Sequence, residues 1–147
     1  MRTAEKDALY LRYYRSRHDE WNCCRGDDYD DAGVLGIMQS QMMENNGNTR
    51  ELEFRDGNQL VGFSTVDYGR HALSAVYTAF DPAYGRRAPG VFAVLAMIDY
   101  ARANGFRWLY LGFLIEDHPK MGYKARYAPG EYLDETTVWR IYHGTNA

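Results

Sequence analysis

The stretch LSAVYTAFDPAYGRRAPGVFAVLAMIDYARANGFRWLYLGFLIEDHPKMGYKARY, residues 73–127, decides the fold. It opens with an apolar segment over residues 73–80, which predicts a strand buried on both faces. The strand ends at Asp81 and Pro82, because proline has no N–H to donate to a strand ladder. A basic turn over residues 86–90 follows.

A helix and a second strand follow the basic turn. Apolar residues at helical spacing predict a helix over residues 91–104, with Pro89 suited to its start and Gly105 to its end. A second apolar run, residues 108–115, predicts a strand that lies beside the first and is covered on both sides. A strand, a crossover helix and a strand in one sheet make the two strands parallel.

The rest of the chain supplies further elements of a mixed sheet. Residues 4–17 predict an amphipathic helix whose arginines form a basic face, for which a solvated surface is the simpler interpretation. Residues 51–80 predict an antiparallel meander with a tight turn at Asp56 and Gly57. A weaker helix over 31–43 and an edge strand over 136–143 complete the expected elements. We therefore expect an α/β (α+β) fold, with a mixed central sheet flanked by helices.

Composition limits the protein class. A chain of 147 residues with 46% hydrophobic residues predicts a single globular domain, residues 1–147. Its net charge of −3 means that contact with RNA requires a local basic patch. The only cysteines, the neighbours Cys23 and Cys24, cannot complete a tetrahedral metal site, so no metal is expected. The sequence shows no signal peptide or membrane span, and a cytoplasmic location without membrane contact is expected.

Several blocks of this sequence resemble the C-terminal region of arginyl- and leucyl-tRNA–protein transferases. The stronger blocks are residues 73–78, 80–82, 86–90, 110–113 and 120–127 with Pro129. Weaker blocks are residues 9–13 with Arg17 and His18, and residues 52–55. The order and spacing of these blocks over about residues 9–133 make the resemblance specific.

The resemblance implies a GNAT-like fold that moves an aminoacyl group from charged tRNA to an amine. The implied product is an amide bond, and the acceptor is a protein N-terminus, a peptide or a small molecule. The aminoacyl-tRNA is a co-substrate, and no cofactor is expected. The sequence departs from the family at Ala88 and Pro89, where Ser-Leu is expected, and at Asp117 and His118, where Gly-Cys is common. We also expect a standalone domain without the family's N-terminal domain, whose role a protein partner would fill.

Two basic segments are the candidate donor-binding residues. Arg86, Arg87 and the backbone around Gly90 precede a helix, where free N–H groups and the helix dipole favour an anion such as a tRNA phosphate. An ordinary exposed turn is the alternative. The second segment combines charge with stacking surface, which suits a single-stranded RNA end, although a solvated basic surface explains each residue equally well. Its candidate residues are Lys120, Tyr123, Lys124 and Arg126.

Aminoacyl transfer requires a free amine and stabilisation of an oxyanion, but no metal and no covalent enzyme nucleophile. Asp81 is the first candidate for the base that takes the ammonium proton, or for an anchor of that ammonium; the alternative is turn formation before proline. His118 is the second candidate base, and a structural or exposed histidine is the alternative. Tyr77 is a candidate to donate to the carbonyl or to stack on adenine, and a core tyrosine is the simpler interpretation.

Two other functions fit the same sequence. The first is an N-acetyltransferase that uses acyl-CoA, although residues 86–90 match a pyrophosphate-binding loop only loosely. The second is a non-catalytic module that binds charged tRNA or protein N-termini. The amino acid carried, the acceptor and the oligomeric state are left open by the sequence.

Overall fold

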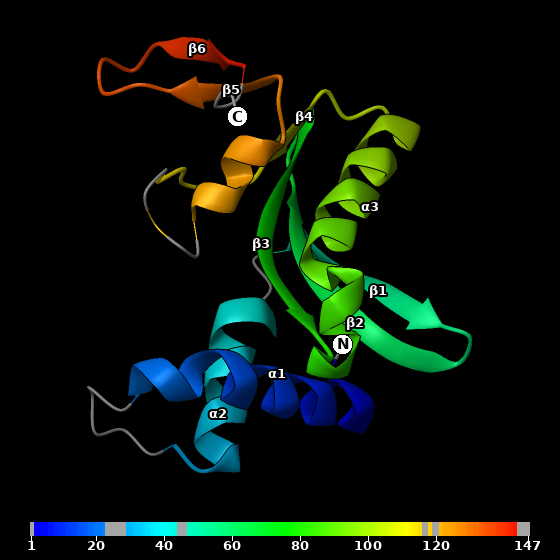
Figure 1. The fold of residues 1–147 in the computed structure, drawn as a ribbon. Coiled ribbons are helices and arrows are strands. Elements are labelled where there is room, and N and C mark those ends of the chain that lie inside the picture. Colours follow the sequence, from blue (N-terminus) through cyan, green and yellow to red (C-terminus); the bar gives the residue numbers. More distant parts are fainter. Residues whose placement is uncertain (1, 23–28, 44–46, 116–117, 119–120, 144–147) are drawn as a thin grey trace. The chain divides into compact units, whose positions relative to one another are not determined.

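The computed structural model describes residues 2–22, 29–43, 47–115, 118 and 121–143 (Figure 1). The chain divides into two compact units, Met1–Tyr110 and Leu111–Ala147, and each is described here by itself. The expectation of one domain over the whole chain stays a prediction.

A four-stranded sheet forms the centre of the first unit (Figure 1). Its strands lie in the order β1, β2, β3, β4, with β1 and β2 antiparallel, β2 and β3 antiparallel, and β3 and β4 parallel. The strands are β1 (Thr49–Asp56), β2 (Gln59–Tyr68), β3 (Ala72–Phe80) and β4 (Trp108–Tyr110). The predicted meander, the central position of the third strand and the parallel pair are confirmed.

The last strand of this sheet is shorter than predicted. The parallel ladder joins only Ala72–Ser74 of β3 to β4, and the run that was expected to continue to residue 115 is not part of a strand after Tyr110. Gly112 adopts a left-handed conformation with φ of 78°, which interrupts a strand. Trp108 and Tyr110 are 38% and 44% exposed, so the expectation of a run covered on both sides is wrong.

Two helices cover one face of the sheet. α1 (Ala4–Asn22) and α2 (Asp31–Met38), which continues as a π-helical segment (Gln39–Met43), match the two helices predicted in the N-terminal part. Asp30 caps α2 by accepting a hydrogen bond of 2.8 Å from the Gly33 amide. These helices pack on the strands through one buried cluster, which contains Leu9, Tyr10, Tyr14, Val34, Met38, Met42, Leu60, Phe63 and Ala79.

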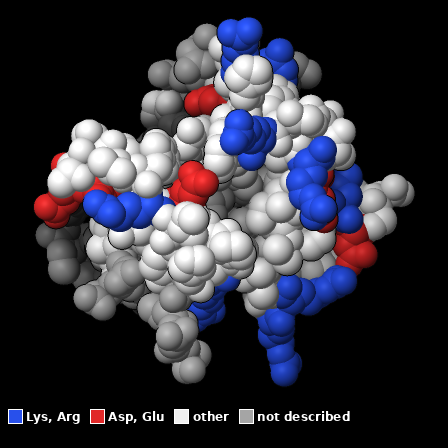
Figure 2. Space-filling model, turned by 90° about the horizontal axis from the view of Figure 1, so that it is seen from above, with Lys and Arg blue, Asp and Glu red and all other residues white. Residues whose placement is uncertain are grey.

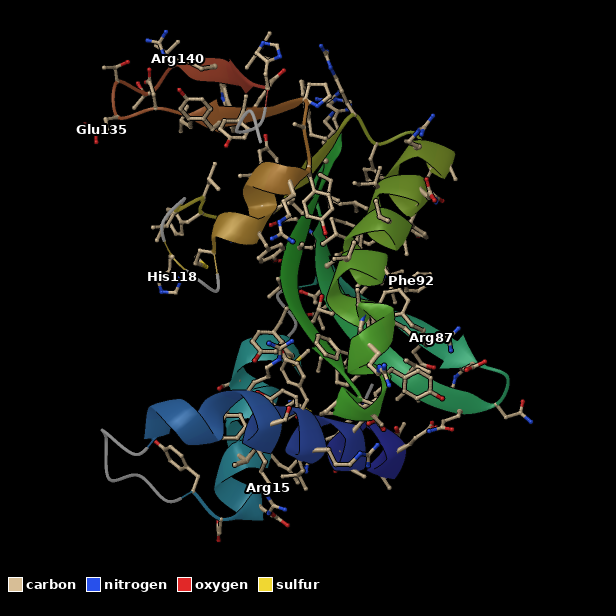
Figure 3. All side chains as sticks on the ribbon, viewed as in Figure 1. Arg15, Arg87, Phe92, His118, Glu135 and Arg140 are labelled. Carbon is tan, nitrogen blue, oxygen red and sulfur yellow. The ribbon has the colours of Figure 1, made fainter. Side chains whose placement is uncertain are left out.

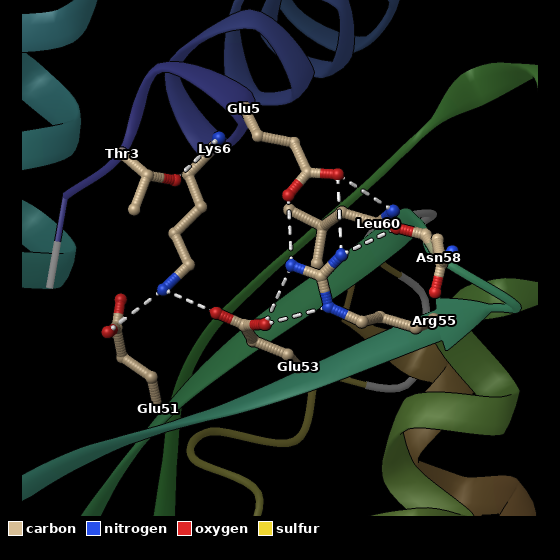
Figure 4. A network of polar contacts seen from close by, with 8 residues as sticks. All are labelled: Thr3, Glu5, Lys6, Glu51, Glu53, Arg55, Asn58 and Leu60. Carbon is tan, nitrogen blue, oxygen red and sulfur yellow. Dashed lines mark hydrogen bonds and ion pairs between the residues drawn. The ribbon is translucent and has the colours of Figure 1, made fainter.

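A polar network also ties α1 to the sheet (Figure 4). The Lys6 side chain is buried, and its ammonium lies 3.1 Å from a Glu51 oxygen and 2.9 Å from a Glu53 oxygen. Arg55 joins Glu53 to Glu5, and Glu5 accepts a hydrogen bond of 3.1 Å from the Leu60 amide. The first turns of α1 are therefore fixed to β1 and to the start of β2.

The third helix, α3 (Pro89–Ala103), is the predicted crossover between β3 and β4 and lies beside them in Figure 1. It buries Ala93, Val94, Met97 and Ala101. Strand residues alternate between the faces of a sheet, so Phe63 and Ala79 face the α1 cluster while Gly62 and Thr78 face α3. The sheet is thus covered by helices on both faces.

The second unit contains a short 3₁₀ helix and a hairpin. The helix η3 (Gly122–Arg126) precedes β5 (Gly130–Leu133) and β6 (Trp139–Tyr142), which pair antiparallel. β6 confirms that a strand lies in the predicted C-terminal range. It belongs to a separate two-stranded sheet with β5, which was not predicted, and is not an edge strand of the four-stranded sheet. Across the described ranges of both units, none of the helices is long and apolar enough to cross a membrane.

Candidate functional site

The basic turn between β3 and α3 is a tight, capped structure. Asp81 ends the strand and caps the 3₁₀ helix η2 (Pro82–Arg87), because its Oδ1 accepts a hydrogen bond of 3.0 Å from the Ala83 amide. Ala88 then adopts a left-handed conformation with φ of 49°, and Pro89 starts α3. The chain thus turns from strand to helix within seven residues, 82–88, and presents both arginines at the end of η2.

The two arginines of this turn differ in their surroundings. Arg87 pairs with Asp56 at 3.0 Å, and its guanidinium lies 5.8 Å from the centre of the Tyr84 ring. Arg86 is exposed and makes no ion pair within the described part of the chain. Of the two, Arg86 is therefore the one whose charge is available to a ligand.

Gly90 lies in the first turn of α3 against the last residue of β3. A Cβ atom at this position would lie 3.5 Å from Phe80 Cε1, which is an ordinary van der Waals contact. Close packing therefore does not require glycine here, and any contact of Gly90 with a ligand would come from its backbone amide.

A cleft of about 240 Å³ opens beside the basic turn, on the face of the sheet that α3 covers. Figure 3 labels two residues that border the cleft, Arg87 at the end of η2 and Phe92 in the first turn of α3. Its walls include Phe54, Gly62, Thr78, Phe80, Tyr84 and Phe92. Aromatic walls with an arginine at the rim suit a flat ring or an apolar side chain. Because strands and helix contribute together, no sequence motif marks this cleft.

Asp81 is almost buried, with 6% of its surface exposed, and both of its carboxylate oxygens are engaged. Oδ1 accepts from the Ala83 amide, and Oδ2 accepts from Nη2 of Arg12 at 2.7 Å. Arg12 belongs to the helix face that the sequence favoured as solvated surface. Periodicity alone could not reveal this pair, because its members are 69 residues apart.

Tyr77 lies in a group of aromatic rings between β3 and α1. Its ring centre is 6.2 Å from that of Tyr10 and 6.3 Å from that of Tyr13. Burial, followed by the neighbouring tyrosines, raises the pKa of Tyr77, and burial raises the pKa of Tyr10 to about 12. Tyr10 and Tyr77 each shift the pKa of the other, although Tyr10 Oη has no partner with hydrogen-bond geometry among the described residues. A tyrosine is a neutral phenol near pH 7 even at its ordinary pKa, so Tyr77 can donate a hydrogen bond, and burial extends this neutral form to higher pH.

The remaining predicted residues belong to the second unit, and Lys120 lies outside the described residues. Lys124 Nζ donates to the Phe113 carbonyl at 2.6 Å, and burial lowers the pKa of Lys124. Tyr123 and Arg126 also lie on η3, and burial raises the pKa of Tyr123. The backbone carbonyl of His118 accepts from the Gly122 amide at 2.8 Å, just before this helix. The Lys124 ammonium therefore holds residues 111–115 to η3.

Figure 2 shows several Lys and Arg side chains next to Asp or Glu side chains. Among the residues that the structure describes, no three His, Cys, Asp or Glu side chains lie close enough together to hold a metal ion. Cys23 and Cys24 are outside these residues. The candidate site thus consists of local features, of which the basic turn with Asp81 is the most fully defined.

Comparison with known proteins identifies the family. The family described as "Arginine-tRNA-protein transferase, C terminus" matches residues 5–134, which is most of the chain. The chain belongs to this transferase family. A protein of Aeromonas hydrophila named "Aspartate/glutamate leucyltransferase" is 41% identical over 127 residues, covering 85% of this chain and 50% of that protein. One of Stenotrophomonas maltophilia with the same name is 41% identical over 140 residues, covering 90% of this chain and 53% of that protein.

The chain spans about half the length of these curated relatives. Its fold is similar to that of the PaiA N-acetyltransferase from Thermoplasma acidophilum, with a TM-score of 0.52 and 12% sequence identity. That alignment covers 93% of this chain and 89% of the acetyltransferase chain. The expected GNAT-like α/β fold is confirmed, and so is the resemblance to the tRNA–protein transferases.

Proposed function

We propose that this chain transfers an aminoacyl group from a charged tRNA to an amine and forms an amide bond. The observation that carries the proposal is the family match over residues 5–134. The names of the relatives support leucine as the transferred residue and an N-terminal aspartate or glutamate as the acceptor. The chain spans about half of those relatives, so both assignments are proposals for it.

The proposed chemistry needs few groups from the protein. The acceptor amine, once it has lost a proton, attacks the ester carbonyl of the aminoacyl-tRNA, and the tetrahedral intermediate then breaks the ester C–O bond. The 3′-terminal ribose oxygen of the tRNA leaves and takes up a proton. The ester is already activated, so positioning and stabilisation of the oxyanion account for the catalysis that is required.

Each candidate residue has a proposed role in this reaction. Arg86, assisted by Arg87 and the amide of Gly90, binds a phosphate or ribose at the acceptor end of the tRNA. Tyr77 donates a hydrogen bond as a neutral phenol, which its raised pKa supports. His118 stays the candidate base. For Asp81, its two existing hydrogen bonds support an anchoring or positioning role over proton transfer.

Basic and aromatic residues of the second unit are separate candidates for donor binding. Lys120, Tyr123 and Arg126 stay candidates for contact with the single-stranded tRNA end. For Lys124, the hydrogen bond to the Phe113 carbonyl supports a role in holding the backbone at residues 111–115.

Replacing Arg86 tests the donor side. Arg86→Ala should weaken binding of the donor tRNA about 10-fold, the effect of losing one hydrogen bond to a charged group. The fold should be unaffected because Arg86 is exposed. Fluorescence anisotropy with labelled tRNA measures the affinity, and Arg102→Ala, an exposed arginine at the other end of α3, is the matched control. Equal affinities for the two variants would reject the donor role of Arg86.

A transfer assay tests the function as a whole. The chain is incubated with [¹⁴C]leucyl-tRNA or [¹⁴C]arginyl-tRNA and with peptides that begin with aspartate, glutamate or alanine. Label should move from leucyl-tRNA to the acidic peptides. A parallel reaction with [¹⁴C]acetyl-CoA tests the acetyltransferase alternative, and label that moves only from acetyl-CoA would reject the proposal. Label that stays on tRNA with every acceptor would reject catalysis by this chain alone.

A further inference from the structure

Arg12 on α1 reaches the start of the basic turn. Its Nη2 donates to Asp81 Oδ2 at 2.7 Å, and its Nη1 donates to the Ala8 carbonyl at 3.1 Å, one helical turn back along α1. The Arg12 side chain is half-exposed, while the Asp81 side chain is 9% exposed. The guanidinium is thus held by its own helix and points one edge at a nearly buried carboxylate.

That carboxylate also holds the first turn of η2. Asp81 Oδ1 accepts from the Ala83 amide, so one side chain joins α1 to the 3₁₀ helix whose last residues are Arg86 and Arg87. A six-residue 3₁₀ helix has few internal hydrogen bonds, and its start therefore depends on this cap.

α1 contacts the residue before Asp81 as well. The Tyr13 ring lies edge-on to Phe80 with centres 5.0 Å apart, and the Arg17 guanidinium lies 5.2 Å from the centre of the Phe80 ring. Phe80 in turn lies against the first turn of α3 at Gly90. Phe80 and Asp81, the last two residues before η2, are consequently both in contact with side chains of α1.

We propose that Arg12 is a positioning residue for the donor site: through Asp81 it sets the orientation of the turn that carries Arg86. This inference rests on the proposed aminoacyl transfer. It assigns Asp81 a positioning role, because both carboxylate oxygens already bind groups of the protein: Oδ2 binds Arg12 and Oδ1 binds the Ala83 amide. It also gives the basic face of α1 a function that its periodicity does not indicate.

Substitutions at both ends of the pair test the proposal. Arg12→Met keeps the volume and removes the charge, and it should weaken binding of labelled tRNA about 10-fold, as expected for loss of one charged hydrogen bond. The kcat at saturating donor should change less than about 3-fold, because the reacting groups are untouched. Arg12→Lys should recover part of the affinity. Arg15→Met is the matched control, since Arg15 lies on the same helix but pairs with Asp31.

Asp81→Asn separates positioning from proton transfer. The amide oxygen of asparagine can still accept from the Ala83 N–H, so Asp81→Asn should lower the tRNA affinity as much as Arg12→Met does. The double variant Arg12→Met, Asp81→Asn should lose little more tRNA affinity than either single variant. A fall in kcat of about 100-fold or more, with unchanged tRNA affinity and loss of the acidic limb of the pH profile, would make Asp81 the base and overturn the proposal.

Two controls separate the possible failures. Circular dichroism and thermal melting check that each variant is folded, and Asp81→Asn tests the pair again if Arg12→Met is unfolded. Affinity for Arg12→Met equal to that of Arg15→Met would overturn the positioning role while wild-type transfer continues. Absence of transfer by the wild-type chain would instead overturn the proposed function, and the tRNA affinities would still test the positioning role.

Discussion

At the scale of single residues, the buried ammonium of Lys6 determines how α1 is fixed to the sheet. Only 3% of Lys6 is exposed, and its charge is balanced by Glu51 and Glu53. Burial of an ammonium is tolerated because two carboxylates and the Phe63 ring, 5.8 Å away, surround it. The network in Figure 4 is therefore sensitive to the loss of any one member.

Lys6→Met should destabilise the protein by about 2–3 kcal/mol. The substitution removes the ammonium that pairs with Glu51 and Glu53. The cost is below the 3–5 kcal/mol or so of a fully buried pair, because Glu53 keeps its ion pair with Arg55 and about a third of its side chain is exposed. Urea denaturation followed by circular dichroism measures the change. Arg2→Met, which removes the exposed pair with Asp7, is the control and should cost far less, because an exposed ion pair contributes little to stability. An equal loss of unfolding free energy in the two variants would show that the buried Lys6 pairs stabilise the protein no more than an exposed pair.

At the scale of elements, the turn between β5 and β6 depends on one carboxylate. Asp134 accepts hydrogen bonds from the Thr136 hydroxyl at 2.6 Å, from the Val138 amide at 3.0 Å and from Arg140 Nε at 2.5 Å. The Thr136 hydroxyl, the Val138 amide and Arg140 together lower the pKa of Asp134 to about 2. A two-stranded hairpin has little stability of its own, so this turn sets its register.

Asp134→Ala should disorder the hairpin while the first unit stays folded. NMR measures this as loss of cross-strand contacts between Leu133 and Trp139, which are paired in the structure. Glu135→Ala, a change at the neighbouring residue of the same turn, is the control and should keep those contacts. Retention of the contacts in Asp134→Ala would show that strand pairing alone holds the hairpin.

The elements that sequence reasoning predicted are those with local signals. The meander has its turn at Asp56 and Gly57, and α3 has Pro89 at its start, so both could be placed from neighbouring residues. β5 has only four residues and no alternating pattern, and it becomes a strand only through pairing with β6. The apolar composition of residues 108–115 predicted one long strand. That prediction failed because Gly112, within this run, adopts a left-handed conformation that a strand does not contain.

The candidate site was predictable to the extent that it is local. The exposed Arg86 and the cap at Asp81 follow from the turn sequence. Arg12 could not be added, because the rest of α1, α2 with its π-helical segment, and three strands separate it from Asp81 in the sequence. The cleft beside Phe92 was missed for the same reason, since its walls come from β1, β2, β3, η2 and α3.

At the scale of the whole molecule, the carboxylates that join α1 to the sheet predict sensitivity to acid. Lys6, followed by Arg55, lowers the pKa of Glu53, and Arg55, followed by the Leu60 amide, lowers the pKa of Glu5. The folded pKa values lie below the unfolded value of 4.5, so the folded state binds fewer protons in this range. Their contribution is therefore complete above pH 4.5 and is lost as the pH falls through the folded pKa values.

The melting temperature should consequently fall as the pH is lowered from 5 to about 3. Glu53→Gln should lower the melting temperature at pH 7 and make it depend less on pH in the acidic range, since one of the linked carboxylates is gone. Differential scanning calorimetry at a series of pH values measures both effects. An acid dependence identical to that of the wild-type protein would exclude Glu53 as a source of the effect.

The contacts of α1 with residues far along the sequence have a consequence for folding during synthesis on the ribosome. α1 is synthesised before the sheet, yet its partners Leu60 and Asp81 come 55 and 69 residues after Glu5 and Arg12. The apolar side of α1, with Leu9 and Tyr10, has no sheet to pack on until β2 and β3 have been synthesised and have left the exit tunnel. During translation the apolar side of this helix therefore stays exposed until the sheet has formed, and nascent-chain chaperones can bind it in that interval.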